Sequence, residues 1–255
     1  MKSVPLPKVG CVAVIDDLDE ADIFDVINLH EQARAALPEN RKRHILPQQA
    51  SYFKDLLAGT TGRMVGIRVE RKLIAQLVLI GPLSLREAIA GNIITHNDLS
   101  FHHASLNDSV IVFKSMASLP DWRGNDLAQS LVDYAENHPF VRVADHLFTQ
   151  ISVSNRRSWN VFAVKKFGIV GAAYDPDDGL PRFVFQKSAF GFDLDPAPIV
   201  DDVDPTDDFD AIVSLTQREG LIGFYEEGQT QKLSFLHNRE ELNLMPVLAR
   251  VSGRQ

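Results

Sequence analysis

Hydrophobic and polar positions follow two different periods along the first half of the chain. Short apolar runs predict strands, whereas apolar residues three or four positions apart predict amphipathic helices. Asp16 or Asp17 is placed to cap the first helix, Pro38 ends it, and Pro47 suits the first turn of the next helix. The expected elements are a strand over residues 9–15, helices over 23–37 and 47–59, and hairpin strands over 63–69 and 72–80.

The second half has the same mixture of periods. Residues 81–108 are longer than a usual connection, so they form a functional loop or contain a short helix over 83–90. The expected elements are strands over 109–116, 146–153, 169–174 and 182–186, with helices from 127 and before 165. This order predicts an α+β fold, with a central mixed β-sheet flanked by helices.

The last part of the chain is rich in Pro and Asp between residues 190 and 210. This composition predicts an acidic linker; an acidic face that recruits an amine is the alternative. Thr206 caps an expected helix over 207–218 that Gly220 ends, and strands over 221–225 and 232–236 form a hairpin. The hairpin is too small to fold alone, so it packs on the main domain or on a second copy, which leaves a homodimer open. We expect a main domain over residues 8–190 and a C-terminal extension over 191–255.

The composition narrows the function classes. With 255 residues and 45% hydrophobic residues the chain can bury a full core, and its net charge of −8 argues against a nucleic-acid partner, which a basic stripe would attract. No apolar run approaches the roughly 18 residues of a membrane span. Cys11 is the only cysteine, which fits a cytoplasmic location, and its apolar surroundings predict a buried core residue rather than a nucleophile.

Residues 116–128 have the layout of a phosphate cradle. A β-branched strand leads into a turn with small residues and Arg123, and a helix follows the turn. The unpaired N–H groups and the dipole of a helix N-terminus suit a pyrophosphate, and Arg123 adds a forked cation. A purely structural turn between a strand and a helix has similar residues, so this alternative stays open for the segment alone.

A second motif follows at a suitable distance. Asn155 comes three residues before Ser158, and the next helix closes in Lys166, Phe167, Gly168 and Ile169. Together the two motifs resemble those of the GNAT superfamily of acyl-CoA-dependent N-acetyltransferases. The residues of the first motif that match the family in place are Pro120, Asp121, Trp122, Arg123, Gly124, Leu127 and Ala128.

The resemblance implies direct attack of an amine on the thioester of acetyl-CoA, the co-substrate, in a wedge between the strands that end at Ser118 and Ser154. The backbone of Met116, Ala117 and Ser118 would pair with the pantetheine arm and polarise the carbonyl, and Asn155 would reach the arm or cap its helix. The pyrophosphate would be held by Arg123, Gly124, Asn125, Asp126, Leu127 and Ala128. A small-molecule amine and a peptide amine are both open as the acceptor, and a water relay is the expected base.

Two residues depart from the family pattern. Asp126 stands where the family has a second glycine, and a carboxylate near the phosphates would cost roughly 1–3 kcal/mol of binding, unless the side chain turns outward as an ordinary acid at the start of the helix. Phe162 lies near the position where many members have a tyrosine that protonates the thiolate of CoA. The acid would then be Ser158, Tyr174 or water.

Three histidines in the connection before residue 109 raise the question of a metal. The spacing of His96, His102 and His103 matches no standard zinc site, so we expect no metal; a substrate contact and solvated loop histidines are the other interpretations.

Three functions of the protein stay open. They are an N-acetyltransferase, a weakly active GNAT-fold acyl-CoA-binding sensor or interaction module, and a different α/β fold whose turn binds another phosphate ligand or none.

Overall fold

The computed structural model of the chain describes residues 2–94, 104–175, 179–189, 191–192, 194, 198, 200–205, 207–217, 221–225 and 232–237. Their contacts divide the chain into two compact units. Unit 1 contains Met1–Leu83 and Val110–Ala144, and unit 2 contains Ser84–Ser109 and Asp145–Gln255. The expected boundary at residue 190 falls inside unit 2 and stays a prediction about independent folding.

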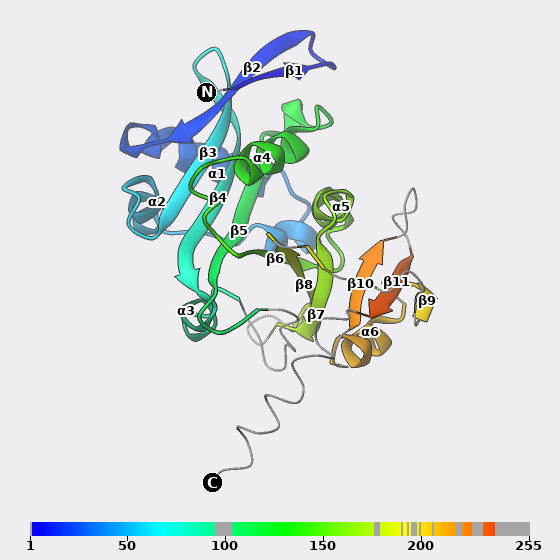
Figure 1. The fold of residues 1–255 in the computed structure, drawn as a ribbon. Helices are drawn as coiled ribbons and strands as arrows, with labels where there is room; N and C mark the ends of the chain where they lie inside the picture. Colours follow the sequence, from blue (N-terminus) through cyan, green and yellow to red (C-terminus); the bar gives the residue numbers. More distant parts are fainter. Residues whose placement is uncertain are drawn as a thin grey trace. The chain divides into compact units, whose positions relative to one another are not determined.

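Unit 1 is built on five neighbouring strands in the order β1-β2-β3-β4-β5 (Figure 1). They are β1 (Lys2–Leu6), β2 (Cys11–Leu18), β3 (Gly62–Val69), β4 (Lys72–Ser84) and β5 (Ser109–Ser118). Strand β1 was not expected from the sequence. It pairs antiparallel with β2 and lies at the edge of the order, where Pro5 can lack an N–H without breaking a ladder on both sides.

Two predictions at the start of the chain are wrong. Asp16 and Asp17 lie inside β2, and Asp19 is the residue that caps the following turn, η1 (Glu20–Asp22); its side chain accepts a hydrogen bond from Ala21 N at 2.8 Å. Cys11 is partly exposed rather than buried, because β2 begins there, at the end of the turn from β1.

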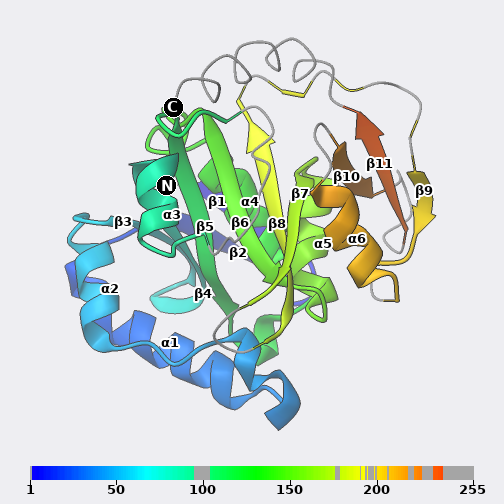
Figure 2. The same ribbon diagram turned by 90° about the horizontal axis from the view of Figure 1, so that it is seen from below.

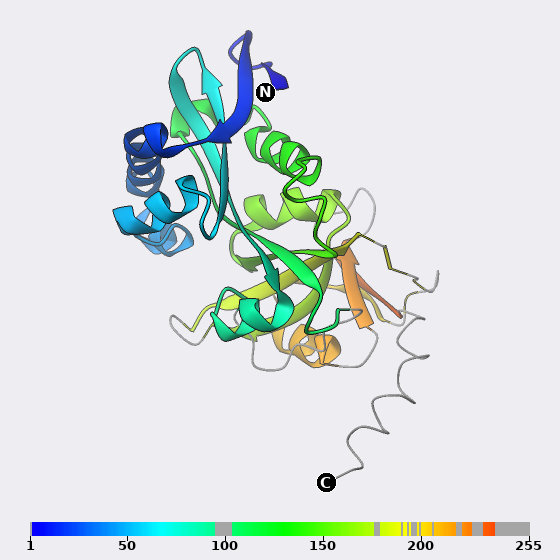
Figure 3. The same ribbon diagram turned by 60° about the vertical axis from the view of Figure 1, so that its left-hand side comes forward.

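The helices of unit 1 cover both faces of its strands. Helices α1 (Ile23–Ala35) and α2 (Ala50–Leu57) lie on one side, and α4 (Leu127–Glu136) lies on the other (Figure 3). Two 3-10 turns, η2 (Glu39–His44) and η3 (Pro120–Trp122), stand in the connections before α2 and α4. The side chain of Leu56 on α2 packs over Gly62 of β3, where an added Cβ would lie 3.1 Å from Leu56 Cδ2. This contact identifies the face of β3 that α2 covers.

Unit 2 contains strands in the order β6-β8-β7-β10-β11-β9 (Figure 2). They are β6 (His146–Ser152), β7 (Gly168–Tyr174), β8 (Pro181–Ser188), β9 (Val200–Val203), β10 (Leu221–Tyr225) and β11 (Leu233–His237). Its helices are α3 (Leu85–Ala90), α5 (Arg156–Val164) and α6 (Phe209–Thr216). The short helix expected before residue 90 is therefore confirmed, and β9 was not expected.

The C-terminal hairpin packs on the strands before it. Strand β10 pairs antiparallel with β7, where Gly223 faces Ile169, and β11 pairs with β10. Within this chain the hairpin thus pairs with the strands before it, and packing on a second copy stays a prediction. Helix α6 begins at Phe209, with Asp208 at its N-cap, so it is shorter than expected; Thr206 and Gly220 lie outside the described residues.

Candidate functional site

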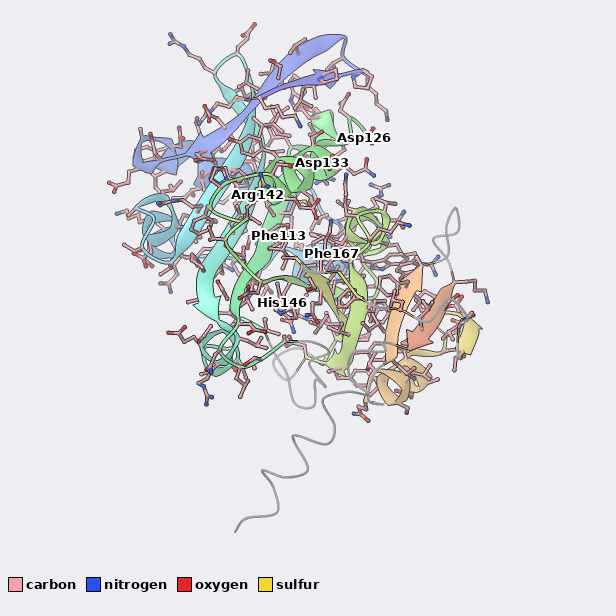
Figure 4. The ribbon with its side chains drawn as sticks, viewed as in Figure 1. Phe113, Asp126, Asp133, Arg142, His146 and Phe167 are labelled. Atoms are coloured by element: carbon pink, nitrogen blue, oxygen red, sulfur yellow. The ribbon has the colours of Figure 1, made fainter. Side chains whose placement is uncertain are left out.

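The turn between β5 and α4 holds two residues in the left-handed backbone region. Gly124 has φ +81° and Asp126 has φ +52°. Asp126 occupies the N-cap of α4, its carboxylate is exposed, and it makes no capping hydrogen bond. The position where the family pattern has glycine thus requires a conformation that glycine adopts freely and that other L-residues adopt at a cost. Figure 4 labels Asp126 at the start of the helix.

A hydrogen bond joins the turn to the connection between β1 and β2. The buried carboxamide of Asn125 accepts a hydrogen bond from Lys8 N at 2.9 Å and donates one to Trp122 O at 3.0 Å. A Cβ at Gly124 would collide with the ammonium group of Lys8, so this cation lies directly over the turn. The Asn125 side chain is therefore structural, and Lys8 is a cation at the turn that the sequence alone did not indicate.

The N–H groups at the start of α4 lack an acceptor within the helix, in the turn that holds Arg123 and that Lys8 contacts. The first helical hydrogen bond runs from Ser130 N to Asp126 O, so the N–H groups of Leu127 and Ala128 have no acceptor within the helix. Within the part of the chain that the structure describes, neither Lys8 nor Arg123 forms an ion pair with a carboxylate. Two cations and a helix N-terminus in one place form a suitable environment for an anion.

Strand β5 contains a bulge just before this turn. Leu119 N donates to Ile74 O at 2.9 Å, and a Cβ at Gly81 would lie 2.6 Å from Val110 O, so β4 and β5 run antiparallel. Ser115, inside β5, has φ +46°, a left-handed conformation that interrupts the regular strand and indicates the bulge. Met116, Ala117 and Ser118, the predicted backbone contacts of the cofactor, follow directly.

A tyrosine from α2 contacts the bulge. The hydroxyl of Tyr52 forms a side-chain hydrogen bond with Ser115, and burial raises the pKa of Tyr52 more than this bond lowers it. The phenol therefore stays protonated and neutral at physiological pH. From the sequence, Tyr52 was only one residue of the expected helix over 47–59.

A glutamine on β4 lies at the same level of the sheet. Gln76 is 0% exposed, and among the described residues neither its Nε2 nor its Oε1 has a hydrogen-bond partner. It faces Gly66 in the ladder with β3, and Gly66 shares its face with Gly62, which α2 covers, so Gln76 faces the α2 side. The signal in the sequence was a single polar residue inside the apolar run 73–80.

In unit 2, Asn155 and Ser158 stand at the start of α5. Asn155 occupies the N-cap without a side-chain capping bond, and its carbonyl accepts from Ser158 N at 2.9 Å. Asn155 therefore takes the N-cap position that the capping interpretation gave it, but its side chain makes no capping bond within the described residues. Phe162 is 2% exposed and contacts Phe167 edge to face, with ring centroids 5.2 Å apart, so it belongs to the core of the unit.

Tyr174 lies at the end of β7 and contacts α6. Its hydroxyl donates to Asp210 Oδ1 at 3.0 Å, and this hydrogen bond raises the pKa of Tyr174. The ring packs edge to face against Phe209, with centroids 5.1 Å apart. Because the proton is directed to Asp210, the contact assigns Tyr174 to the packing of α6, and Ser158 is the stronger candidate for the acid.

The candidate residues fall into two groups. The nine cofactor candidates between Met116 and Ala128 form one continuous segment of unit 1, whereas Asn155, Ser158 and Tyr174 belong to unit 2. Sequence reasoning missed four residues that lie in or beside the first group: Lys8, Tyr52, Gln76 and Ser115.

No group of three or more potential ligands among the described residues could hold a metal ion, and His96, His102 and His103 lie outside those residues. Of the described helices, none combines the length and the apolar character required to cross a bilayer.

Comparisons with known proteins identify the fold. A scan against protein-family models found no match, and a search of curated proteins found none. Solved structures, by contrast, match with probability 1.00. NAA60 of Arabidopsis thaliana in complex with acetyl-CoA is 12% identical, with a TM-score of 0.51 over 70% of this chain and 99% of its own.

Two bacterial structures match equally well. An N-acetyltransferase of Staphylococcus aureus is 13% identical, with a TM-score of 0.50 over 71% of this chain and 100% of its own. The GNAT domain of S. lividans PAT is 14% identical, with a TM-score of 0.51 over 72% of this chain and 96% of its own. The fold is therefore that of the GNAT acetyltransferases, and the predicted fold class, helices flanking a central mixed sheet, is confirmed.

Proposed function

We propose that this protein is an acetyltransferase that transfers an acetyl group from acetyl-CoA to an amine. The observation that carries the proposal is the turn before α4. There Lys8 and Arg123 lie beside free helix N–H groups, in a chain whose fold is the GNAT fold. The match to NAA60 in complex with acetyl-CoA supports the choice of this co-substrate.

The residues of the turn fit the pyrophosphate of acetyl-CoA. The left-handed Gly124 keeps the backbone free of a Cβ, and Arg123, Lys8 and the N–H groups of Leu127 and Ala128 would bind phosphate oxygens. The exposed carboxylate of Asp126 opposes this binding. By resemblance to the family, Met116, Ala117 and Ser118 would pair with the pantetheine arm, and Asn155 would reach it.

The chemistry is direct attack at the thioester. The neutral amine nitrogen forms a bond to the carbonyl carbon, the bond from that carbon to sulfur breaks, the amine loses a proton to water, and the thiolate takes one up. Backbone N–H groups polarise the carbonyl, and Ser158 or water supplies the proton to sulfur. The products are the acetylated amine and free CoA.

A second candidate function is a GNAT-fold protein that binds acyl-CoA with little turnover. Two observations favour low turnover over an active enzyme. The hydroxyl of Tyr174 is engaged with Asp210, and Phe162 is buried, so neither supplies an acid. Ser158 is then the remaining side-chain candidate of the three that the sequence suggested.

Calorimetric titration of acetyl-CoA tests the cofactor site. We expect micromolar binding to the wild type and about tenfold weaker binding to Arg123→Ala, because a charge-assisted contact to phosphate is lost. Lys187 belongs to unit 2 and lies over the ring of Phe167. The variant Lys187→Ala is the matched control and should bind acetyl-CoA as the wild type does. If the wild type does not bind, the proposed function fails. Once binding is measured, release of free CoA with a panel of amines separates the enzyme from the sensor.

A further inference from the structure

Gln76 has an unsatisfied hydrogen-bonding requirement in the interior of unit 1. A buried carboxamide without partners costs about 1–3 kcal/mol for each unsatisfied polar group, so such groups normally have partners. Gln76 is fully buried, and within the described part of the chain neither its donor nor its acceptor is paired. An apolar residue of similar size would pack in β4 without this cost, which indicates that the carboxamide has a partner when the protein works.

The position of Gln76 is tied to the segment proposed to hold the thioester. Ile74 O accepts from Leu119 N, and Gly81 lies beside Val110 and Ile111, so the antiparallel ladder brings Gln76 opposite Met116 or Ala117. The side chain faces the α2 side of the sheet. Tyr52 reaches the same segment from α2 through its hydrogen bond to Ser115. Ser115 and Met116 on this segment are partly exposed.

The chemistry of these groups selects a ligand. Gln76, Tyr52 and Ser115 are all uncharged, because the raised pKa of Tyr52 keeps its phenol neutral. A carboxylate would leave the Gln76 oxygen facing another acceptor, and an ammonium group would leave its NH₂ facing another donor. A secondary or primary amide satisfies both ends, since its carbonyl accepts from Nε2 and its N–H donates to Oε1.

We propose that Gln76 and Tyr52 form an acceptor subsite that binds a neutral amide next to the reacting amine. The inference rests on the proposed acetyl transfer. It narrows the acceptor to amines with an amide close by, such as the α-amine of a peptide or of an amino-acid amide. Tyr52 acts as a positioning residue: its hydroxyl, oriented by Ser115, contacts the amide carbonyl.

Matched acceptors test the subsite. A panel of amino-acid amides and the corresponding methyl esters differs only in the group that Gln76 would recognise. We expect the wild type to prefer an amide to its ester by at least about fivefold in kcat/KM, the loss of one buried hydrogen bond. The two variants to compare are Gln76→Met and Tyr52→Phe, with Gln32→Met on the exposed side of α1 as the matched control. Since the intrinsic reactivity of each amine is the same with every variant, a change in the amide-to-ester ratio reports on the subsite.

The expected result is a ratio that falls to within about twofold of unity in Gln76→Met and a higher KM with little change in kcat in Tyr52→Phe. Both variants should bind acetyl-CoA as the wild type does. Gln76→Met should unfold at the same or a higher denaturant concentration, because an unpaired carboxamide is removed. This stability readout distinguishes the subsite from a structural role.

Three results would overturn the inference. The first is acetyl-CoA binding without turnover of any amide in the panel. The second is an amide-to-ester ratio unchanged in Gln76→Met, together with loss of stability, which would mean that a buried water satisfies Gln76. The third is a wild type without preference for amides. Absence of acetyl-CoA binding would instead remove the proposed function, and this inference with it.

Discussion

Asp126 has a side chain in a backbone conformation that costs an ordinary L-residue about 1–2 kcal/mol. Asp and Asn reduce this cost through local hydrogen bonds, yet the Asp126 carboxylate makes no capping bond. The residue therefore carries two separable penalties. One is conformational and acts on folding, and the other is a negative charge beside the anion site and acts on binding.

Asp126→Gly should remove both penalties. We expect the free energy of unfolding to rise by about 0.5–1 kcal/mol and acetyl-CoA to bind at least about fivefold more tightly. Denaturant unfolding and calorimetry measure the two effects. Asp126→Asn is the matched control: it removes the charge and tolerates the left-handed region, so it should improve binding without the full gain in stability. Weaker binding in both variants would show that the carboxylate contributes to the cofactor site.

His30 on α1 gives a prediction about pH. It is 4% exposed, its Nε2 donates to Leu46 O at 2.9 Å, and burial lowers its pKa from the ordinary 6.5. Below pH 6.5 the unfolded chain takes up a proton that the folded protein resists, so stability falls as the pH falls through the interval between 6.5 and the lowered folded pKa. The His30→Gln variant lacks this contribution.

Urea unfolding at pH 7.5, 6.5 and 5.5 measures the effect. The free energy of unfolding of the wild type, minus that of His30→Gln, should decrease as the solution becomes more acidic. Other titrating groups are common to both proteins and cancel in the difference. Parallel pH curves would show that His30 is protonated equally in the folded and unfolded chains.

At the scale of elements, α5 carries Ser158 and Phe162 four positions apart, which places them one turn from each other on nearly the same side of the helix. Trp159, Val161 and Phe162 are buried, whereas Ser158 is only partly covered. The indole N–H of Trp159 donates a hydrogen bond to Val153 O at 3.0 Å, which holds the start of α5 against the end of β6. Phe162 therefore belongs to the core of unit 2, and a hydroxyl at this position would be buried against Phe167.

Phe162→Tyr tests this orientation. A hydroxyl buried against Phe167 without a partner should lower the free energy of unfolding by about 1–3 kcal/mol and leave the rate of CoA release unchanged or lower. Thermal unfolding and CoA release measure the two effects. Val164→Thr, a small polar change at an exposed position of the same helix, is the control. A stable Phe162→Tyr protein with faster CoA release would place this position at the reaction.

At the scale of the whole molecule, the C-terminal elements complete the apolar packing of unit 2. Ile222 of β10 covers Gly168 of β7, which has no room for a side chain there. Helix α6 adds buried Phe209 and Ile212, and Phe235 is buried on β11. These contacts make the extension part of the fold of unit 2.

A chain that ends after Ala189 should therefore be strongly destabilised. Removing the C-terminal elements exposes apolar side chains on β7 and β8, and we expect a loss of at least about 3 kcal/mol in the free energy of unfolding. A chain that ends after His237 retains every described element and is the matched control. Circular dichroism during heating measures both. An unchanged midpoint for the shorter chain would support an independent domain over residues 8–190.

Much of the element order was predictable, and the reasons are local. Apolar periods identified the helices and strands from residue 23 to residue 188, and Pro38 and the glycines marked their ends. Strands β1 and β9 were missed because they are short and contain proline or acidic residues, so their pairing with β2 and β11 stabilises them rather than their own composition. The turn at residues 116–128 was recognised because its residues are contiguous.

The sequence alone determined the fold class and the strand, turn and helix around Arg123, because these follow from local patterns, and it identified Asp126 as a departure from the family glycine. The left-handed conformation of Asp126 was found only in the structure. The tertiary structure decided which distant residues meet there. Lys8 lies over Gly124, Tyr52 contacts Ser115, and Gln76 faces α2 without a partner. Such meetings depend on strand register and on which face a helix covers, and a shift of one residue in register would turn Gln76 to the other face.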